Sequence, residues 1–315
     1  MKVVVQIPCL NEERTLGMVL KTIPKKIEGV DSIEILIIDD GSTDNTVALA
    51  KQHGVKHFVY HPQNQGLARS FHDGINRALE LGADIVVNTD GDNQYPQERI
   101  ADLVQPILQN KADIVIADRQ VDNIKHFSPT KKLLQKFGTR VLNLAAGTRV
   151  PDAPSGFRAY SKEALIRLNI VTRFSYAMET IIQAGNKQLS IVSLPIRTNP
   201  KTRESRLFKS NWQHVRKSGM AIVRAFIMYK PYVLFTTLGL LLLVSGLVPF
   251  VRYLYFFLTE ESRGAHHLQS LILGSVLLVA SFIAFTLGIV ADLIRINRVL
   301  IENSLEETKR ARFSK

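Results

Sequence analysis

Residues 33–54 read IEILIIDDGSTDNTVALAKQHG, and this stretch gives the clearest indication of the fold class. Its first seven residues are mostly β-branched or apolar, which predicts a buried strand over 33–39. After a turn, 43–54 has helical spacing and ends at a glycine. We expect Ser42 or Thr43 to cap this helix, because a side-chain oxygen can accept from its free N–H groups.

The same alternation continues on both sides of this stretch. Apolar runs predict further strands at 3–8, 55–61, 84–90 and 112–118. Periodic stretches predict helices at 12–23, 67–82 and 96–110. Strands and helices that alternate with short links predict an α/β domain, in which a mostly parallel sheet lies between helix layers. Ligands of such sheets bind at the carboxyl ends of the strands.

Length and composition exclude several classes of protein. The chain has 315 residues, 46% hydrophobic and 22% charged, so it is neither disordered nor of low complexity. A single cysteine, Cys9, excludes a disulfide scaffold and a metal site of clustered cysteines. The amino-terminal MKVVVQIP lacks the pattern of a signal peptide, and we expect it to form the first strand.

The formal net charge of +12 comes mostly from the last third of the chain. Residues 1–196 hold 23 basic and 21 acidic side chains, whereas 197–315 hold 17 and 7. Such a surplus suits either nucleic acid or an anionic membrane. Two uncharged stretches, 233–251 and 270–291, favour the membrane, because each is long enough as a helix to cross about 30 Å of hydrocarbon. The alternative for the two stretches is a pair of buried core helices. Nucleic-acid binding is not expected, because the first 196 residues are nearly neutral.

The charges of the flanking segments predict the orientation of the two spans. Nine Lys and Arg residues lie in 197–230 and six in 293–315, whereas the connecting loop 259–267 has only Arg263. The positive-inside rule then places both termini and the α/β domain in the cytoplasm.

The segment before the first span has the pattern of a basic amphipathic helix. Apolar side chains from Leu207 to Phe226 recur at steps of three and four, and most of the basic ones fall off that stripe. We expect this helix to lie in the lipid headgroup plane, the alternative being a helix packed on the α/β domain. The predicted organisation is a catalytic domain, this helix, two spans and a cytosolic basic tail, at 1–204, 205–230, 231–258, 268–292 and 293–315. Glycines in the spans would allow helix packing and permit a homo-oligomer: Gly239, Gly246, Gly274 and Gly288.

An acidic loop after the fourth strand is the first candidate site. Asp90 and Asp92 flank a glycine there, and Gln94 could add a third oxygen ligand. Oxygen ligands favour Mg²⁺ or Mn²⁺, and an ion held by few protein groups can neutralise a departing diphosphate. An ordinary acidic turn is the alternative.

Two other strand ends carry candidate donor-binding groups. Asp39 or Asp40 could accept a hydrogen bond from a base or ribose. Gly66 and Arg69 open the helix at 67–82, where either phosphate binding or plain capping would suit them. Arg119 follows the fifth strand.

Taken in order, five motifs resemble family 2 glycosyltransferases: Ile7–Glu13, Asp39–Ser42, Asn64–Gly66, Asp90–Gln94 and Ser155–Arg158. With two spans at the carboxyl end, the chain is most similar to polyprenyl-phosphate glycosyltransferases, such as dolichol-phosphate mannose synthases and bacterial polyprenyl-phosphate glucosyltransferases. The resemblance implies a glycosyltransferase-A fold, Rossmann-like with a mostly parallel sheet, and a nucleotide-diphosphate sugar donor. It also implies a polyprenyl or dolichyl phosphate acceptor.

The resemblance also implies roles for single residues. Positions that line the nucleotide match Pro8, Leu10, Glu12, Asp40 and Arg69. The metal-binding motif matches Asp90, Asp92 and Gln94, with Mg²⁺ or Mn²⁺ as the ion. Catalytic roles fall to Asp92, Asp152 and Arg119, where Asp152 is either an active-site acid or a structural acid paired with Arg149 or Arg158.

The acceptor phosphate is expected to meet a group of cations: Arg119, Lys131, Lys132, Arg203 and Arg206. Relatives carry a Gly-x-Ser-Lys-like run near the membrane, and this chain has Arg203-Glu204-Ser205-Arg206 in its place. The lipid phosphate is already anionic, so catalysis would come from positioning and from charge stabilisation at the leaving diphosphate. A single displacement would invert the anomeric centre.

Two other functions stay open at this point. A polysaccharide or glycolipid synthase of the same superfamily is one, although the Gln-x-x-Arg-Trp segment of processive enzymes is absent and the only tryptophan, Trp212, follows Asn211. The other is a non-catalytic membrane scaffold that retains the fold. The sugar could be a hexose from a GDP-mannose or UDP-glucose type of donor.

Overall fold

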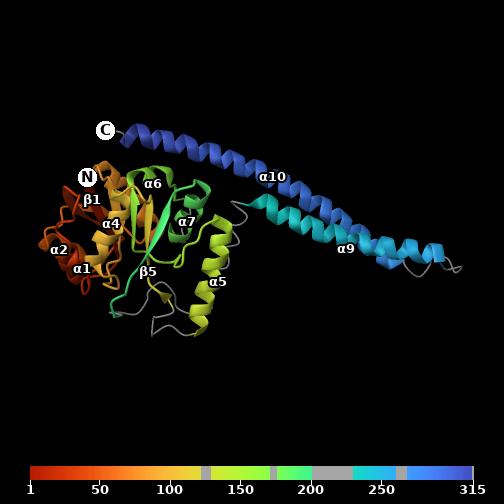
Figure 1. The fold of residues 1–315 in the computed structure, drawn as a ribbon, viewed down its shortest axis with the longest axis horizontal. Coiled ribbons are helices and arrows are strands. Elements are labelled where there is room, and N and C mark those ends of the chain that lie inside the picture. The colour runs from red at the N-terminus through yellow and green to blue at the C-terminus, as the bar shows by residue number, and fades with distance from the viewer. Residues whose placement is uncertain (122–128, 171–175, 201–229, 260–267, 314–315) are drawn as a thin grey trace. The chain divides into compact units, whose positions relative to one another are not determined.

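The computed structural model describes residues 1–121, 129–170, 176–200, 230–259 and 268–313 (Figure 1). The chain divides into two compact units, of which the first is made of two separate pieces of sequence. Unit 1 comprises Met1–Ile222 together with Leu305–Lys315, and unit 2 comprises Val223–Ser304.

Unit 1 is built on one seven-stranded sheet, in the order β3-β2-β1-β4-β6-β5-β7. Its strands are β1 (Lys2–Cys9), β2 (Ser32–Asp39), β3 (His57–Tyr60), β4 (Ile85–Asn88), β5 (Ile114–Asp118), β6 (Arg158–Ser161) and β7 (Ile191–Pro195). Every neighbouring pair is parallel except the two pairs that β6 makes with β4 and β5. The predicted α/β class with a mostly parallel sheet is therefore confirmed. The antiparallel β6 and the edge strand β7 lie beyond the predicted strands.

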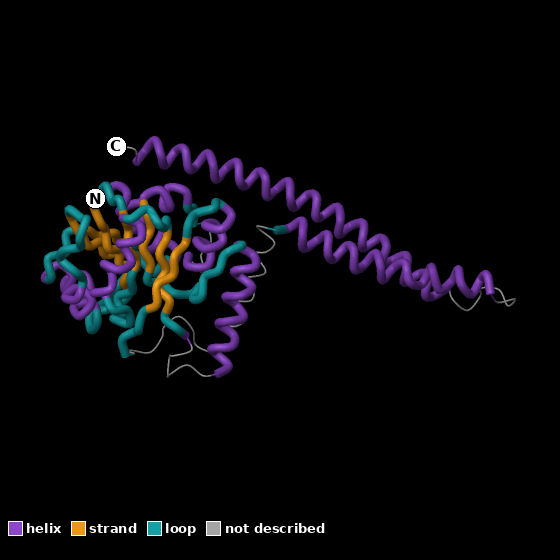
Figure 2. The backbone as a smooth tube through the Cα atoms, viewed as in Figure 1, coloured by secondary structure: helices purple, strands orange, loops and turns teal. Residues whose placement is uncertain are grey.

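Helices cover both faces of this sheet (Figure 2). Those of unit 1 are α1 (Leu16–Thr22), α2 (Thr46–Gln52), α3 (Leu67–Glu80), the 3₁₀ turn η1 (Gln97–Arg99), α4 (Ile100–Leu108), α5 (Pro129–Ala146), α6 (Lys162–Arg167) and α7 (Tyr176–Asn186). Alternate residues of β1, such as Val3 and Val5, join one core cluster with α1 and α4. On the other face α3 contacts β1 and β2, and its Phe71 stacks on Tyr176 of α7.

The predicted cap of the second helix is wrong. Helix α2 begins at Thr46, and neither Ser42 nor Thr43 caps it. The Ser42 Oγ accepts from the N–H of Asn11, and the N–H of Thr43 donates to the Asn11 side chain. Because β1 and β2 end side by side, Ser42 and Thr43 form hydrogen bonds with the loop after β1 and do not reach the helix end. The predicted helix end is confirmed, since Gly54 adopts a φ of +81°, which favours glycine.

Unit 2 contains two long helices, α9 (Pro231–Thr259) and the span-forming part of α10 (Leu268–Phe313), which lie side by side (Figure 1). Glycines permit their close approach. A Cβ on Gly246 would come within 3.1 Å of the Gly274 carbonyl, and one on Gly239 within 2.7 Å of the Phe285 ring. The Ser281 hydroxyl also donates to the Gly239 carbonyl at 2.8 Å. The four glycines named for helix packing lie against the other helix of the same chain, and a homo-oligomer stays a prediction.

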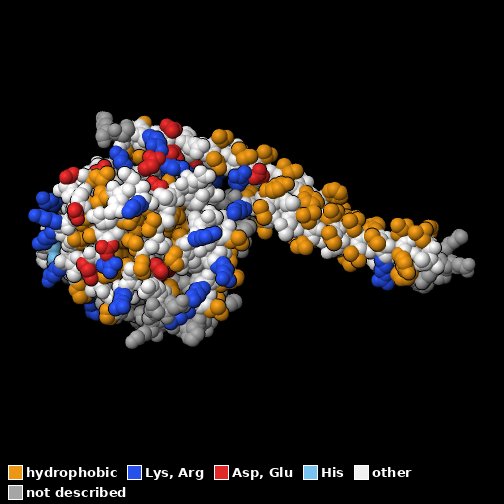
Figure 3. Space-filling view, viewed as in Figure 1, with side chains coloured by type: hydrophobic (Ala, Val, Ile, Leu, Met, Phe, Trp, Pro, Cys, Tyr) orange, Lys and Arg blue, Asp and Glu red, His pale blue; other side chains and the backbone are white. Residues whose placement is uncertain are grey.

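Both helices are long and apolar enough to cross a membrane. Most of their large apolar side chains are exposed, and Figure 3 shows them along α9 and α10. A core helix of a soluble protein would bury these side chains. The alternative of two buried core helices is therefore not what the described residues show.

Helix α10 continues past its apolar part without a break, although we predicted a separate tail after residue 292. Its last turns belong to unit 1 and contact α6 and its surroundings. Glu306 lies 3.7 Å from Arg167 and 3.6 Å from Lys187, and Arg310 pairs with Glu163. Basic side chains of this segment thus bind protein groups, although Arg310 and Arg312 remain 39% and 63% exposed.

Lys309 lies within this contact, where its Nζ donates to the Leu168 carbonyl at 2.7 Å. Burial, with a smaller contribution from Lys187, lowers the pKa of Lys309 to about 8. Between this pH and about 10.5 the unfolded chain binds the lysine proton and the folded chain does not, so the free energy of unfolding rises with pH across this window.

We therefore expect the thermal midpoint of the full chain, relative to a Lys309→Met variant, to increase between pH 7 and pH 9.5. Scanning calorimetry of the two proteins in the same detergent measures this difference. An exposed lysine variant, Lys26→Met, serves as the control and should show no such trend. A constant difference between wild type and Lys309→Met would contradict the expectation.

Candidate active site at the carboxyl edge of the sheet

The topology brings the predicted motifs to one edge of the sheet. Strands β2, β1 and β4 are parallel neighbours, so their carboxyl ends meet there. Because β6 is antiparallel to β4, with Arg158 opposite Asn88, its amino end lies at the same edge. Strand β5 is antiparallel to β6, so Arg119 follows at that edge as well.

The acidic loop after β4 has an internally bonded form. Asp92 accepts from the backbone N–H of Gln94 at 3.1 Å and from its side-chain amide at 2.8 Å. The side-chain nitrogen Nε2 of Gln94 is therefore used, and the side-chain oxygen Oε1 remains available as a ligand. Asp90 lies beside Gly156, because a Cβ on that glycine would be 3.4 Å from both Asp90 oxygens.

These donors fit a hard divalent ion that takes only part of its coordination from protein. Asp90, Asp92 and Gln94 offer oxygen atoms alone, which Mg²⁺ and Mn²⁺ prefer. Within the described ranges there is no group of three or more His, Cys, Asp or Glu side chains that could hold a metal by itself. The remaining coordination positions would be left for water or for a diphosphate.

Asn199 fastens this loop, although no feature of the sequence singled it out. It follows β7, and its N–H donates to the Gln94 carbonyl at 2.9 Å. Its side-chain amide donates to the carbonyls of Asn93 and Tyr95 at 3.1 and 3.3 Å. Only the fold brings it there, because 106 positions separate Asn199 from Asn93.

We expect Asn199→Ala to raise the Mn²⁺ concentration that half-activates transfer by at least about fivefold. The variant loses two hydrogen bonds, each contributing about 0.5–1.5 kcal/mol. Part of the free energy of ion binding must then order the loop, which weakens the observed binding. A Mn²⁺ titration of sugar transfer measures the effect. Asn186→Ala is the matched control, because its amide only bonds the Ile182 carbonyl within α7. Unchanged Mn²⁺ dependence in Asn199→Ala would show that the hydrogen bonds of Asn199 do not order the acidic loop.

A buried polar chain holds Gly156 against the acidic loop. The Gly156 N–H donates to the Tyr95 hydroxyl at 3.0 Å, and its carbonyl accepts from Asn88 at 2.8 Å. Asn88 in turn accepts from Gln6 at 2.9 Å and donates to Tyr176 at 2.9 Å. Burial, reinforced by Asp90 and opposed by Arg119, raises the pKa of Tyr95 to about 12, so its hydroxyl stays neutral. This series of buried hydrogen bonds fixes both the backbone of Gly156 and the space beside Asp90.

Asp152 is paired with Arg119, not with Arg149 or Arg158 as we considered. Two guanidinium bonds of 2.7 and 2.9 Å join them, and the Arg119 N–H adds a third at 3.1 Å. Gln135 of α5 donates a fourth at 3.2 Å. Asp152 is fully buried, whereas the Arg119 side chain is 18% exposed. Arg158 is fully buried too, and its guanidinium bonds the carbonyls of Ala153, Ser155 and Ala177 and the Thr180 hydroxyl.

This geometry favours a positioning role for Asp152 over a role as proton acceptor. Its oxygens already accept four hydrogen bonds, which leaves little capacity for a substrate proton. Burial opposes the charge on Arg119, but Tyr95, Asp152 and Asp90 outweigh it and raise the pKa of Arg119. The pair therefore presents a permanent cation, held in place, next to the acidic loop.

Asp40 and Asp39 have different surroundings. Asp40 is buried and accepts from the N–H groups of Gln65 and Gly66 at 2.8 and 2.9 Å, and from His61 at 2.7 Å. The Gly66 N–H, a candidate for phosphate, is thus bonded to Asp40. Asp39 bonds only the Ser42 N–H through one oxygen, and its other oxygen has no partner in the described part of the chain. Asp39 is therefore the more available of the two for a donor.

The remaining donor candidates lie around the same edge. Glu12 is buried and accepts from the Thr15 hydroxyl at 2.9 Å, and its side chain lies against Gly91 of the acidic loop. Pro8 is the last but one residue of β1, and the half-buried Leu10 follows the end of the strand. Arg69 is 56% exposed and pairs with Asp73 at 2.7 Å. Glu12 thus contacts the acidic loop, and no contact among the described residues identifies a base pocket.

Several acceptor candidates lie outside the described residues. They are Arg203, Arg206, the side chain of Lys131 and all but the last residue of the segment predicted as an amphipathic helix at 205–230. Lys132 is described and is half-buried in the first turn of α5. Their roles stay predictions.

Comparison with known proteins agrees with this site. The family model described as glycosyl transferase family 2 matches residues 4–168, just over half of the chain. The chain belongs to glycosyl transferase family 2. The match extends from β1 through the acidic loop to α6, so the candidate site lies inside the region that defines this family of glycosyltransferases.

Two curated relatives carry names that concern lipid phosphates. This family 2 glycosyltransferase is 31% identical over 214 residues to a UDP-N-acetylglucosamine–dolichyl-phosphate N-acetylglucosaminyltransferase of Methanococcus voltae, a match that covers 61% of this chain and 83% of that protein. It is 24% identical over 206 residues to a polyprenol monophosphomannose synthase of Mycolicibacterium smegmatis, with coverage of 62% and 76%.

A solved structure supports the fold. The crystal structure of glucosyl-3-phosphoglycerate synthase from Mycobacterium tuberculosis, in complex with Mn²⁺, UDP and glucosyl-3-phosphoglycerate, superposes with a TM-score of 0.55 and 21% identity. It covers 72% of this chain and 78% of the other. The glycosyltransferase-A-like fold expected from the sequence is therefore confirmed.

Proposed function

We propose that this glycosyltransferase moves a hexose from a nucleotide-diphosphate sugar to a polyprenyl or dolichyl phosphate at the cytoplasmic face of a membrane. The observation that carries the proposal is the juxtaposition, at one sheet edge, of an acidic loop suited to a metal diphosphate and the fixed cation Arg119. The names of the relatives support the acceptor, and the two apolar helices support a membrane location.

The proposed reaction needs little proton chemistry from the protein. A lipid phosphate is anionic at neutral pH, so it can attack the anomeric carbon directly and invert it. Arg119, held by Asp152, would orient that phosphate by charge-assisted hydrogen bonds. Asp90, Asp92 and Gln94 would hold Mg²⁺ or Mn²⁺, which when bound supplies positive charge to the leaving nucleoside diphosphate. Asp39 is the described carboxylate best placed to bind the nucleoside.

The topology proposed from loop charge has support in unit 1. The chain up to Ile222 and the last turns of α10, from Leu305, belong to the same compact unit. If both helices cross the membrane, the two flanking segments must lie on one side of it. The excess of Lys and Arg in those segments supports the cytoplasmic side, with both termini there.

A transfer assay on the full chain in detergent tests the proposal. GDP-mannose, UDP-glucose and UDP-N-acetylglucosamine, each radiolabelled in the sugar, are offered with a short-chain polyprenyl phosphate and Mn²⁺. We expect one donor to give a singly glycosylated lipid phosphate. A polymeric product would support a polysaccharide synthase instead. No transfer from any of the three, by a folded protein that binds nucleotide, would leave the scaffold alternative.

Arg203 and Arg206 should matter to the acceptor alone. Replacing both with Ala removes two charge-assisted hydrogen bonds, each contributing about 1.5–3 kcal/mol, so we expect at least about a tenfold loss of efficiency toward the acceptor. Nucleotide affinity should stay the same. The test uses a short-chain polyprenyl phosphate in neutral detergent, where no bilayer charge contributes. Unchanged acceptor kinetics there would reduce the two arginines to electrostatic membrane anchors.

A further inference from the structure

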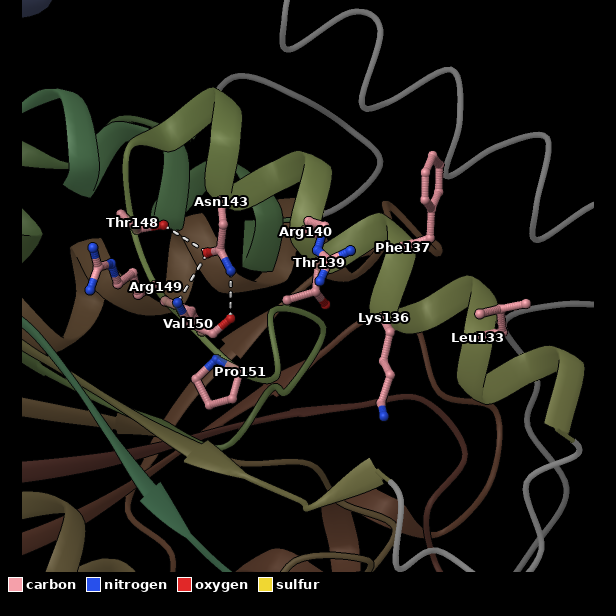
Figure 4. Close-up of a pocket in the computed structure, with 10 residues that line it drawn as sticks. All are labelled: Leu133, Lys136, Phe137, Thr139, Arg140, Asn143, Thr148, Arg149, Val150 and Pro151. Atoms are coloured by element: carbon pink, nitrogen blue, oxygen red, sulfur yellow. Dashed lines mark hydrogen bonds between the residues drawn. The ribbon is translucent and has the colours of Figure 1, made fainter.

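A pocket of about 590 Å³ lies between α5 and the loop that follows it (Figure 4). Residues of the helix form one wall, and Thr148 to Pro151 form the other. Asn143 fixes the two walls together. Its amide donates to the Val150 carbonyl at 2.8 Å, and its oxygen accepts from the Val150 N–H at 3.0 Å and the Thr148 hydroxyl at 2.9 Å. The pocket is therefore a built feature of the fold.

The charged groups that line this pocket are all basic: Lys136, Arg140 and Arg149. Arg140 and Arg149 are exposed and have no hydrogen bond or ion pair with any described residue. Other arginines of unit 1 do pair, such as Arg77 with Glu80 and Arg99 with Asp102. Two unpaired guanidinium groups on one concave surface suit an anion with several oxygens.

The rest of the lining is largely apolar. Leu133 and Phe137 of α5 are 68% and 65% exposed, and the exposed Pro151 continues the apolar surface on the facing loop, where Val150 is buried. A free inorganic anion would gain nothing from burying these side chains. An anion attached to a hydrocarbon chain would bind the arginines and cover the apolar surface together.

We propose that this pocket binds the headgroup of an anionic phospholipid. Among amphiphilic anions, a phospholipid is favoured because two helices of this chain are suited to a bilayer, where such lipids are the solvent. The pocket adjoins the active site, because Pro151 of its lining precedes Asp152 and Gln135 of α5 donates to Asp152 at 3.2 Å. Among the described residues no hydrogen bond joins Arg140 or Arg149 to Arg119, Asp152 or the acidic loop, so the two arginines are not part of the catalytic cluster. The proposal rests on the membrane location proposed above, not on the identity of donor or acceptor.

Photocrosslinking of the full chain in neutral detergent tests the proposal. The probe is a phosphatidylglycerol with a photoactivatable acyl chain, and crosslinked peptides are mapped by mass spectrometry. We expect labelling within residues 133–151 that unlabelled phosphatidylglycerol competes away and phosphatidylcholine does not. Inorganic phosphate at the same concentration should not compete. Labelling elsewhere only, equal competition by phosphatidylcholine, or displacement by inorganic phosphate would overturn the proposal.

Variants separate the charged and apolar parts of the pocket. Arg140→Gln with Arg149→Gln should lower labelling of this segment by about tenfold or more, because two charge-assisted bonds are lost. Lys25→Gln with Lys26→Gln is the matched control, since it removes two exposed charges outside the pocket and should leave labelling unchanged. Equal labelling of the arginine variant and this control would overturn the proposal. Should the arginine variant not fold, Leu133→Gln with Phe137→Gln tests the same pocket and should also lower labelling of the segment. The competition experiment on the wild type tests the proposal without any variant.

Sugar transfer is measured on the same samples, so that the two proposals can fail separately. In the wild type, sugar transfer without labelling of the segment would refute the lipid pocket alone. Labelling of the segment by a protein without transfer activity would refute the proposed function alone. Retention of the protein in bilayers after alkaline washing tests the shared premise of membrane location.

Discussion

Replacing Asp92 with Asn should abolish sugar transfer, with a loss of at least about a thousandfold. The carboxylate would become a neutral amide at a candidate metal position, and a bound metal contributes several kcal/mol of charge stabilisation to the leaving diphosphate. Asp92 also accepts both bonds from Gln94, and Asn keeps one oxygen that can accept from it, so the loop retains part of its internal bonding. Transfer rates and Mn²⁺ binding by calorimetry, measured on the same preparation, should both fall.

Asp102→Asn provides the matched control for this prediction. Asp102 lies on α4 and pairs with Arg99 at the surface, where an ion pair contributes little to stability. This variant should keep normal transfer, and both variants should keep the thermal midpoint of the wild type. Chelation by EDTA should silence the wild type as fully as the Asp92 substitution. Near-normal activity of Asp92→Asn with saturating Mn²⁺ would show that the acidic loop is not the metal site.

Breaking the Arg119–Asp152 pair should have the second largest effect. Arg119→Gln leaves a fully buried carboxylate without its cation, and breaking such a pair costs about 3–5 kcal/mol of stability. We expect both a marked drop in the thermal midpoint and a loss of transfer. Asp152→Asn should destabilise less, because the Arg119 side chain retains some exposure to water.

The double variant separates the contribution of the pair to stability from its role in sugar transfer. With both charges removed, Arg119→Gln with Asp152→Asn should regain most of the lost stability, because no uncompensated buried charge remains. Transfer should stay low, because the cation that would orient the acceptor phosphate is gone. Arg119→Lys should restore charge but not the two-pronged contact with Asp152, and so recover only part of the activity. A double variant with wild-type transfer would remove Arg119 from the site.

The sequence predicted those parts of the site that depend on local pattern. Parallel strands must end at a common edge, so the positions of Asp39, Asp90 and Arg119 at one edge followed from the strand–helix alternation. The acidic loop could be identified because its residues adjoin one another. The fold class could be predicted for the same reason.

Contacts between distant segments could not be predicted in this way. Asn199 binds a loop 106 positions earlier, and Arg119 binds an acid 33 positions later, with two arginines nearer to that acid in sequence. The cap of α2 failed for a related reason, since Ser42 has a partner, Asn11, that only the pairing of β1 with β2 supplies. The four glycines of the spans showed that close packing was possible but not which helices would pack.

The two-piece composition of unit 1 has a consequence for biosynthesis. Domains generally fold in order as the ribosome releases them, amino-terminal part first. The sheet can assemble early, but α6 receives Glu306, Lys309 and Arg310 only after both apolar helices have been translated. If the two helices span the membrane as proposed, a chain whose second helix failed to insert would hold these residues on the wrong side. Completion of the catalytic unit would thereby report that the hairpin is correctly inserted.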